Sequence, residues 1–400
     1  MKHVRIYTIV SLILLLLSAW ELKAQKLEWS VDFDYFFDNS EFDRSLNLSE
    51  SSGTFHAARL TPRIGLYLPK GEKLSHRIML GVDLYKDIGT ATSMLSLMGE
   101  PTLYYHLDAR FRNNAEFTAV AGAFPRKFLD GEYYGSFFDE VILFEDNNIE
   151  GCLFKYKGDK IFTELALDWM GKLADEQHPE RRERFSIISH GMWEFIPNLS
   201  FGWTGHFYHF ACSKVKKNVI DNHAVFPYLE YTPKISWLDE LHFDLGPIIS
   251  YQRDRSIDKK PIVPLGLQFI QKFSVKGFFL ENWLYYGETL QPYYYLDEPD
   301  LYVGEAAYRL LTEKPSAIDC LALGYSRQIG DYAKFMVGAA FHFGAPIEYQ
   351  SQKIGIYRGC QQCISLSFEF GSSQMRAAQK REKREKRERE SINIFDLFGI

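Results

Sequence analysis

The sequence has few of the features that mark catalysis or helical membrane insertion. It holds five cysteines in 400 residues, and the closest two, Cys360 and Cys363, would point to opposite faces of a strand. It contains no GxSxG, no HExxH and no glycine-rich phosphate-binding loop. Beyond its first 24 residues it has no unbroken apolar run of about 18 residues, which a spanning helix needs. We therefore predict no catalytic residue, no cofactor and no metal site, and we exclude a helical membrane bundle.

The first 24 residues have the pattern of an export signal. Lys2 and Arg5 precede an apolar run over residues 9–17, and Ala24 provides a small residue before Gln25. The run is too short for a membrane anchor. We expect residues 1–24 to be a signal peptide that is removed.

The rest of the chain alternates apolar and polar residues. In the first such stretch Leu27, Trp29 and Val31 share one face, and Glu28 and Asp32 share the other. Alternation of this kind also fits a soluble sandwich, so strand number and connections must decide. Sixteen strands are predicted at about 27–37, 55–68, 75–88, 101–110, 115–125, 151–158, 160–170, 184–195, 198–211, 223–233, 239–252, 262–274, 277–288, 317–328, 331–344 and 360–371.

The predicted connections alternate in length. Those after even-numbered strands are short, such as 158–159 and 275–277, whereas 38–54, 126–149 and 289–316 follow odd-numbered strands and are long. Short periplasmic turns with long outer loops are typical of outer-membrane barrels. We predict an all-β fold in which residues 25–372 form a closed antiparallel transmembrane β-barrel in the outer membrane, with both barrel ends in the periplasm.

Two groups of residues within the predicted strands need comment. Pro62 and Pro227 each remove a backbone donor, and we interpret them as β-bulges. Four tryptophans lie near predicted strand ends and could form aromatic girdles at the membrane interfaces: Trp29, Trp169, Trp193 and Trp283.

The same alternation predicts which charged residues line the interior. Acids outnumber bases in this set, and a barrel of sixteen strands leaves an aqueous channel. We therefore expect outer-membrane lipid outside, small hydrophilic solutes inside, and a mild preference for cations. The predicted pore-lining residues are Glu28, Asp32, Asp34, Arg59, Arg63, Arg77, Asp83, Asp108, Glu164, Asp168, Glu230, Asp244 and Glu369.

The third long connection, residues 125–150, mixes charged and aromatic residues. Its length and composition suit a loop folded into the pore. General porins narrow their pores with their third loop, and this connection resembles that loop in its position along the chain. An external lid or receptor surface is the alternative. The predicted constriction residues are Arg126, Lys127, Asp130, Glu132, Asp139 and Glu140.

Several segments resemble known proteins. Residues 122–131 (GAFPRKFLDG), 138–140 (FDE), 150–151 (EG) and 300–309 (DLYVGEAAYR) are similar to segments of uncharacterised porin-like outer-membrane β-barrel proteins of the Bacteroidota. The resemblance spans most of the mature chain. It implies the barrel fold and the outer-membrane location, and it carries no catalytic or ligand-binding residue.

A channel for passive diffusion of small hydrophilic solutes is our first functional hypothesis. The alternatives are a non-conducting barrel that binds a glycan or a protein through its outer loops, and a barrel-embedded hydrolase. We expect residues 373–400 to form a charged periplasmic tail that favours a helix, and bases predominate over 380–390. Residues 376–400 could contact a periplasmic partner, and we expect no nucleic acid binding.

Overall fold

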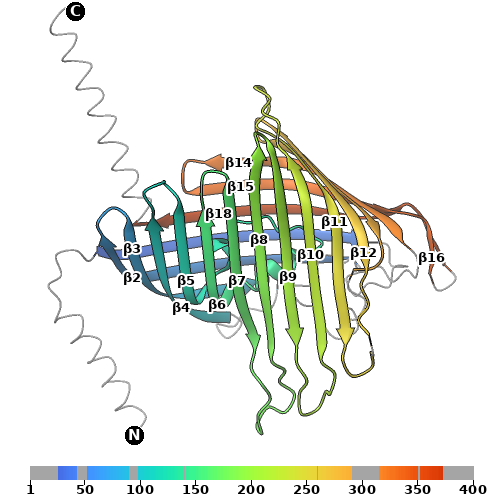
Figure 1. Cartoon of the computed structure of the whole chain (residues 1–400), viewed down its shortest axis with the longest axis horizontal. Coiled ribbons are helices and arrows are strands. Elements are labelled where there is room, and N and C mark those ends of the chain that lie inside the picture. Colours follow the sequence, from blue (N-terminus) through green and yellow to red (C-terminus); the bar gives the residue numbers. More distant parts are fainter. Residues whose placement is uncertain are drawn as a thin grey trace, which may run out of the picture.

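The computed structural model describes residues 26–42, 52–89, 98–138, 140–258, 260–290, 315–349 and 352–372. Within these residues, sixteen antiparallel strands form one closed barrel (Figure 1). The predicted fold class and strand number are confirmed. The barrel strands are β1 (Lys26–Phe42), β2 (Gly53–Lys70), β3 (Leu74–Asp87), β4 (Met98–Arg110), β5 (Glu116–Pro125), β6 (Asn148–Lys157), β7 (Ile161–Gly171), β8 (Arg184–Ile196), β9 (Leu199–Phe210), β10 (Ile220–Tyr231), β11 (Glu240–Asp254), β12 (Leu265–Val275), β13 (Phe278–Gly287), β14 (Ser316–Ile329), β15 (Ala333–Gly344) and β18 (Tyr357–Gly371).

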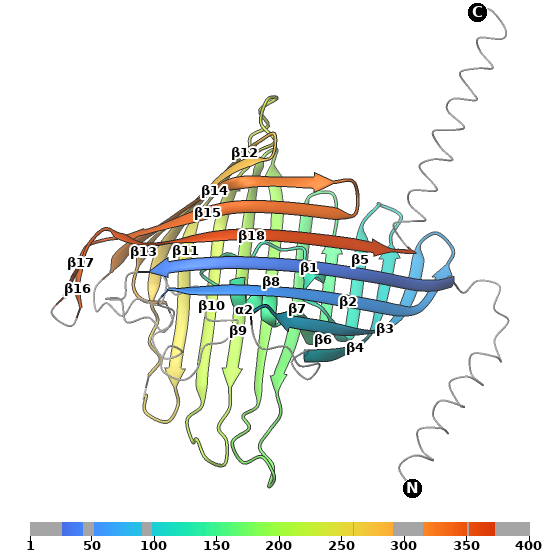
Figure 2. The ribbon, with the colours of Figure 1, turned by 180° about the vertical axis from the view of Figure 1, so that it is seen from behind.

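The ring closes between the first and last strands. β1 pairs with β18 from Ser30↔Gly371 to Phe42↔Gly359, and Figure 2 shows the two strands side by side. A small hairpin that the sequence pattern did not predict, β16 (Ile347–Tyr349) with β17 (Gln352–Ile354), lies in the connection before β18. No helix among the described residues is long and apolar enough to cross a membrane.

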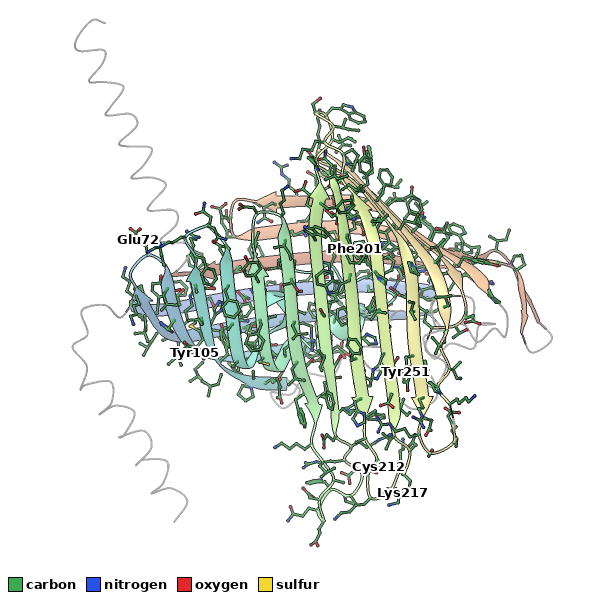
Figure 3. All side chains as sticks on the ribbon, in the orientation of Figure 1. Glu72, Tyr105, Phe201, Cys212, Lys217 and Tyr251 are labelled. Atoms are coloured by element: carbon green, nitrogen blue, oxygen red, sulfur yellow. The ribbon has the colours of Figure 1, made fainter. Side chains whose placement is uncertain are left out.

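Alternation along the strands separates an apolar outer face from a polar inner face. On β9, Phe201 (labelled in Figure 3) and Phe207 are exposed, whereas Ser200 and Thr204 are buried. The neighbours of a transmembrane strand are lipid on one side and the lumen on the other, so a period of two is the expected pattern. The alternation described for the first stretch therefore also holds along β9.

The connections differ between the two ends of the barrel, which we call the turn end and the loop end. At the turn end β12 and β13 are joined by Lys276 and Gly277, with φ of 50° and 86°. Positive φ at both central residues is what a tight two-residue hairpin requires. The loop end carries the longer connections, including the one that contains Cys212 and Lys217 in Figure 3.

The two strand prolines are not at bulges, so that interpretation was wrong. The β1–β2 register runs unbroken through Val31↔Pro62, and the β9–β10 register runs through Trp203↔Pro227. Pairing is interrupted only on the other side of each strand, between β2 and β3 at Pro62 and between β10 and β11 at Pro227. In both places the register is the same before and after the gap. A missing N–H affects one ladder, which explains why the strand need not bulge.

The four tryptophans do not all face outward. Trp169 and Trp193 are exposed on the outer face. Trp283 instead faces the lumen, on the same side of β13 as Glu281, and it packs against the buried core. The girdle prediction is wrong for Trp283 because it considered nearness to a strand end and not the side on which the residue falls.

A polar row interrupts the apolar outer face at β12 to β14. Gln271 Nε2 donates to Asn282 Oδ1 at 3.1 Å, and Asn282 Nδ2 donates to Asp319 Oδ1 at 2.5 Å. Exposed Leu267 and Leu284 lie on the same face of β12 and β13. The row therefore places a carboxylate on a surface that is otherwise apolar.

Candidate functional site: the lumen and its folded loop

The third long connection, residues 126–147 (hereafter L3), folds into the lumen. It contains a short 3-10 helix, Arg126–Phe128, and the helix α2 (Glu140–Glu145), which lies within the ring of strands (Figure 2). At one side Phe144 stacks on Phe36 with ring centroids 5.4 Å apart. At the other side Lys272 of β12 contacts Glu132. L3 thus reaches from β1 across the lumen to β12.

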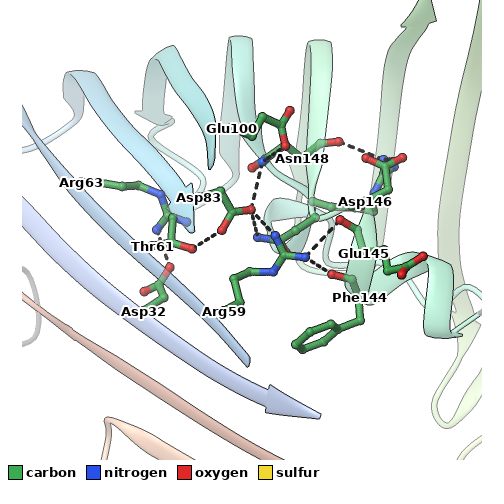
Figure 4. Close-up of polar contacts among 12 residues, drawn as sticks. Asp32, Arg59, Thr61, Arg63, Asp83, Glu100, Phe144, Glu145, Asp146 and Asn148 are labelled. Atoms are coloured by element: carbon green, nitrogen blue, oxygen red, sulfur yellow. Dashed lines mark hydrogen bonds and ion pairs between the residues drawn. The ribbon is translucent and has the colours of Figure 1, made fainter. Parts of the chain in front are cut away.

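Arg59 of β2 forms the first anchor of L3 (Figure 4). Its guanidinium pairs with Asp83 at 2.5 Å and donates to the carbonyl oxygens of Phe144 and Glu145. Its centre also lies 5.2 Å from the centroid of the Phe144 ring. Arg59 and Asp83 are buried, so an ion pair shielded from solvent holds the C-terminal end of α2.

Arg126 forms the second anchor. Its Nη2 lies 2.8 Å from Asp168 Oδ2, 3.1 Å from Asp146 Oδ2 and 3.0 Å from the carbonyl oxygen of Asn148. The side chains of Arg126 and Asp168 are 4% and 3% exposed. Charge-assisted bonds shielded in this way are stronger than exposed ones, so this pair ties the start of L3 to β7.

Glu164 of β7 forms the third anchor by receiving three donors from L3. They are the backbone N–H groups of Asp130 and Gly131, at 2.8 and 2.9 Å, and the Tyr133 hydroxyl at 2.8 Å. A Cβ on Gly131 would lie 2.6 Å from Glu164 Oε1 and 2.5 Å from His190 Cγ. Glycine is needed because the backbone lies directly against the carboxylate.

Lys127 and Lys155 add ion pairs along the same loop. Lys127 Nζ lies 2.8 Å from Asp32 and 3.1 Å from Glu369, and Lys155 Nζ lies 2.6 Å from Asp130. These pairs are partly exposed, so they contribute less than the buried anchors.

The far side of L3 contacts the wall of β10 to β12. The Tyr134 hydroxyl donates to Asp244, and Glu132 pairs with Lys272. Burial works against ionisation of Glu132, but Lys272, His242 and the Tyr134 hydroxyl together outweigh it and lower the pKa of the Glu132 carboxyl. Burial, together with the charges of Glu132 and Asp244, holds the pKa of Tyr134 well above its usual value. The pair is therefore charged and the phenol neutral near pH 7.

The predicted charged residues fall on the inner face of the barrel. Many of them contact L3 or pair with one another, and so do not face open water. Arg63 pairs with Asp32, and Arg77 pairs with Asp108. Asp139 lies outside the described residues, and the side chain of Glu140 is likewise not described. The predicted pore-lining residues that are buried are Glu28, Asp32, Arg59, Arg63, Asp83, Glu164, Asp168, Glu230 and Asp244; Asp34, Arg77, Asp108 and Glu369 are less buried.

A cavity of about 470 Å³ lies along the wall that runs from β11 through β15 to β18 and β1. It extends from Glu240 and Gly277, near the turn end, to Asp38 and Gln361, near the loop end. Its charged lining residues are Asp38, Glu240, Glu281 and Lys334. Three acids and one base give this part of the lumen a negative charge.

Sequence reasoning missed several of these residues. Asp38 was placed in a loop because the first strand was ended at residue 37, although Asp38 has the same parity as Asp32. Glu240 lies in a predicted strand and has the same parity as Asp244, but the predicted pore-lining set does not include it. Tyr134 and Phe144 gave no signal, because their partners are distant in the sequence.

Comparison with known proteins supports the architecture. No protein-family model matches the chain, and no curated protein matches it. Among solved structures, two of OpdO from Pseudomonas aeruginosa, one also titled OccK3, each align with a TM-score of 0.50 at 11% identity, over 87% of this chain and 98% and 96% of theirs. OpdL from the same organism aligns with a TM-score of 0.48 at 11% identity, over 87% of this chain and 99% of its own. At this identity the likeness to OpdO shows a shared fold.

Proposed function

We propose that this protein is an outer-membrane, porin-like channel through which small hydrophilic solutes diffuse passively, with a mild preference for cations. The observation that carries the proposal is the negatively lined cavity along the wall from β11 through β15 to β18 and β1. A barrel of this strand number encloses more space than its side chains fill, and in this proposal the cavity is the water-filled part of the lumen.

The distribution of paired charges supports the cation preference. Arg59, Arg63 and Arg126 each contact a buried carboxylate on the side of the lumen that L3 occupies. Glu240 and Glu281 instead face the cavity. In water two charges about 4 Å apart interact by about 1 kcal/mol, so a few such acids bias ion passage modestly.

L3 would set the size limit of the channel. It is anchored to β2, β7 and β12, so it narrows the lumen from both sides. Within this proposal Arg126, Lys127, Asp130 and Glu132 hold the constriction in place, and Asp139 and Glu140 belong to the same segment.

Location and processing complete the proposal. The exposed apolar side chains of the outer face suit outer-membrane lipid. Residues 1–24 would direct export, the turn end and both barrel termini would face the periplasm, and residues 376–400 would be available there to a partner. The membrane would be that of a member of the Bacteroidota, as the sequence resemblance implies.

The test is single-channel recording of the folded protein in planar bilayers, with the reversal potential measured under a salt gradient. We expect stable steps and a cation preference that falls by at most about fivefold in Glu240→Gln/Glu281→Gln, the factor that about 1 kcal/mol represents. Asp175→Asn is the matched control, because it removes an exposed acid in the β7–β8 connection. Silent bilayers from a demonstrably folded barrel would overturn the channel, and unchanged selectivity in the double variant would overturn the role of the cavity acids.

A further inference from the structure

A second cluster of titratable groups lies where β10, β11 and L3 meet. Glu230 of β10 is directly opposite Asp244 of β11, and His242 is two residues from Asp244 on the same inner face. One ligand atom from each of these three residues lies within 4.8 Å of the others. The strand register therefore fixes two carboxylates and an imidazole around one point.

The hydrogen bonds at this cluster are incomplete among the described residues. Asp244 is 0% exposed, and its Oδ1 has no hydrogen-bond partner there. His242 Nε2 lies 2.9 Å from Asp244 Oδ2 and 4.0 Å from Glu230 Oε2, without the geometry of a hydrogen bond. A buried carboxylate oxygen left in this way is costly, since burial removes the water that would otherwise solvate it.

Positive charge is also in short supply around the cluster. Lys272 is paired with Glu132. The Tyr134 hydroxyl lies within hydrogen-bond distance of both Glu132 and Asp244, but it has one proton and can satisfy only one of them at a time. Glu230 and Asp244 are left with His242 as their nearest compensating group.

We propose that Glu230, His242 and Asp244 bind one divalent transition-metal ion. Carboxylate oxygens and imidazole nitrogen suit ions such as Mn²⁺ and Zn²⁺. Metal–ligand bonds of about 2.0–2.2 Å need the ligand atoms slightly closer together than they lie here, and side-chain rotation supplies that movement. Water from the lumen completes the coordination, and Tyr134 orients Asp244 from outside.

The site lies two strands away from a residue that lines the cavity. Glu281, which lines the cavity, is opposite Lys272 on the neighbouring strand, and Lys272 is opposite His242. This proposal departs from the expectation of no metal site, because these ligands come from strand pairing and form no sequence motif.

The test is titration of Mn²⁺ into the full, detergent-folded, chelator-treated protein, with free Mn²⁺ followed by its electron paramagnetic resonance signal. We expect about one bound ion per chain, displaced by Zn²⁺, and at least tenfold weaker binding in Asp244→Asn and His242→Gln. His209→Gln is the control, since His209 also faces an aspartate, Asp221, but there Arg255 completes the charge balance. This control should bind as the unaltered protein does.

Binding is measured without conduction, so its result is independent of the channel proposal. Glu230→Gln provides a second test if the Asp244 or His242 variants do not fold, and folding is checked by the heat-dependent shift in gel mobility. Absence of Mn²⁺ binding, or binding that survives in the folded variants, would overturn the site.

Discussion

The Arg126–Asp168 pair gives the sharpest test of how L3 is held. Arg126→Met keeps the apolar part of the side chain and removes the guanidinium, leaving Asp168, which is 3% exposed, without its cationic partner. Removing one member of a buried ion pair costs about 3–5 kcal/mol. Asp168 also accepts the backbone N–H of Glu150 at 3.1 Å, so we expect the lower end of that range, about 3 kcal/mol.

A double variant separates the loss of the ion pair from the cost of leaving a buried carboxylate without a compensating charge. In Arg126→Met/Asp168→Asn no buried charge is left alone, so we expect most of the loss to be recovered. The measurement is urea unfolding of the folded barrel, followed by gel mobility, with proteolysis of L3 as a local readout. The single variant should unfold at lower urea and be cleaved faster in L3.

Two outcomes would refute this reasoning. A single variant within about 1 kcal/mol of the unaltered protein, with L3 equally protected, would mean that the pair does not hold the loop. A double variant as unstable as the sum of the two single variants would mean that the aspartate and the arginine act independently.

Three further predictions follow from the same contacts. Gly131→Ala should destabilise the protein by about 1–3 kcal/mol and loosen L3 in proteolysis, because the new Cβ would lie against Glu164 and His190; an unchanged midpoint would show that the loop has room there. The pKa of Glu132 is lowered in the folded protein, since Lys272 and its other polar neighbours together outweigh the effect of burial. The stabilisation from the ionised Glu132 should therefore be present above the ordinary glutamate pKa of about 4.3 and be lost as the pH falls through the lower folded value. The urea midpoint of the unaltered protein should therefore fall only below the ordinary glutamate pKa, and this fall should be smaller in Glu132→Gln. Asp319→Leu should raise barrel stability in detergent by about 1 kcal/mol, because a carboxylate leaves the apolar outer face and Asn282 keeps the carbonyl oxygen of Cys320 at 3.4 Å; a loss of stability would indicate that another protein covers this face.

Strand positions could be predicted from the sequence because each strand borders lipid on one face and the lumen on the other, which imposes a period of two. Asp32 and Asp244 were placed on the inner face for this reason. Trp283 could have been placed there too, since it has the parity of Glu281.

The loop contacts could not be predicted in the same way. Tyr134 contacts Asp244, which is 110 residues away, and Arg59 contacts the backbone of Phe144, which is 85 residues away. Such pairs depend on the path of L3 across the lumen, and alternation carries no information on that path. The division of the lumen into a filled side and an open side is therefore a property of the folded barrel.

The meeting of β1 and β18 has a consequence for how the protein is made. The Trp29 N–H donates to Ser372 Oγ at 3.1 Å across 343 residues of sequence, so the last seam cannot form until nearly the whole chain has been synthesised. Bringing two such distant segments together costs about 5 kcal/mol in chain entropy by the logarithmic dependence on loop length. Until then both strands present unpaired edges that favour aggregation. A deletion within β18 would therefore leave an open sheet with two such edges, in place of a slightly smaller barrel.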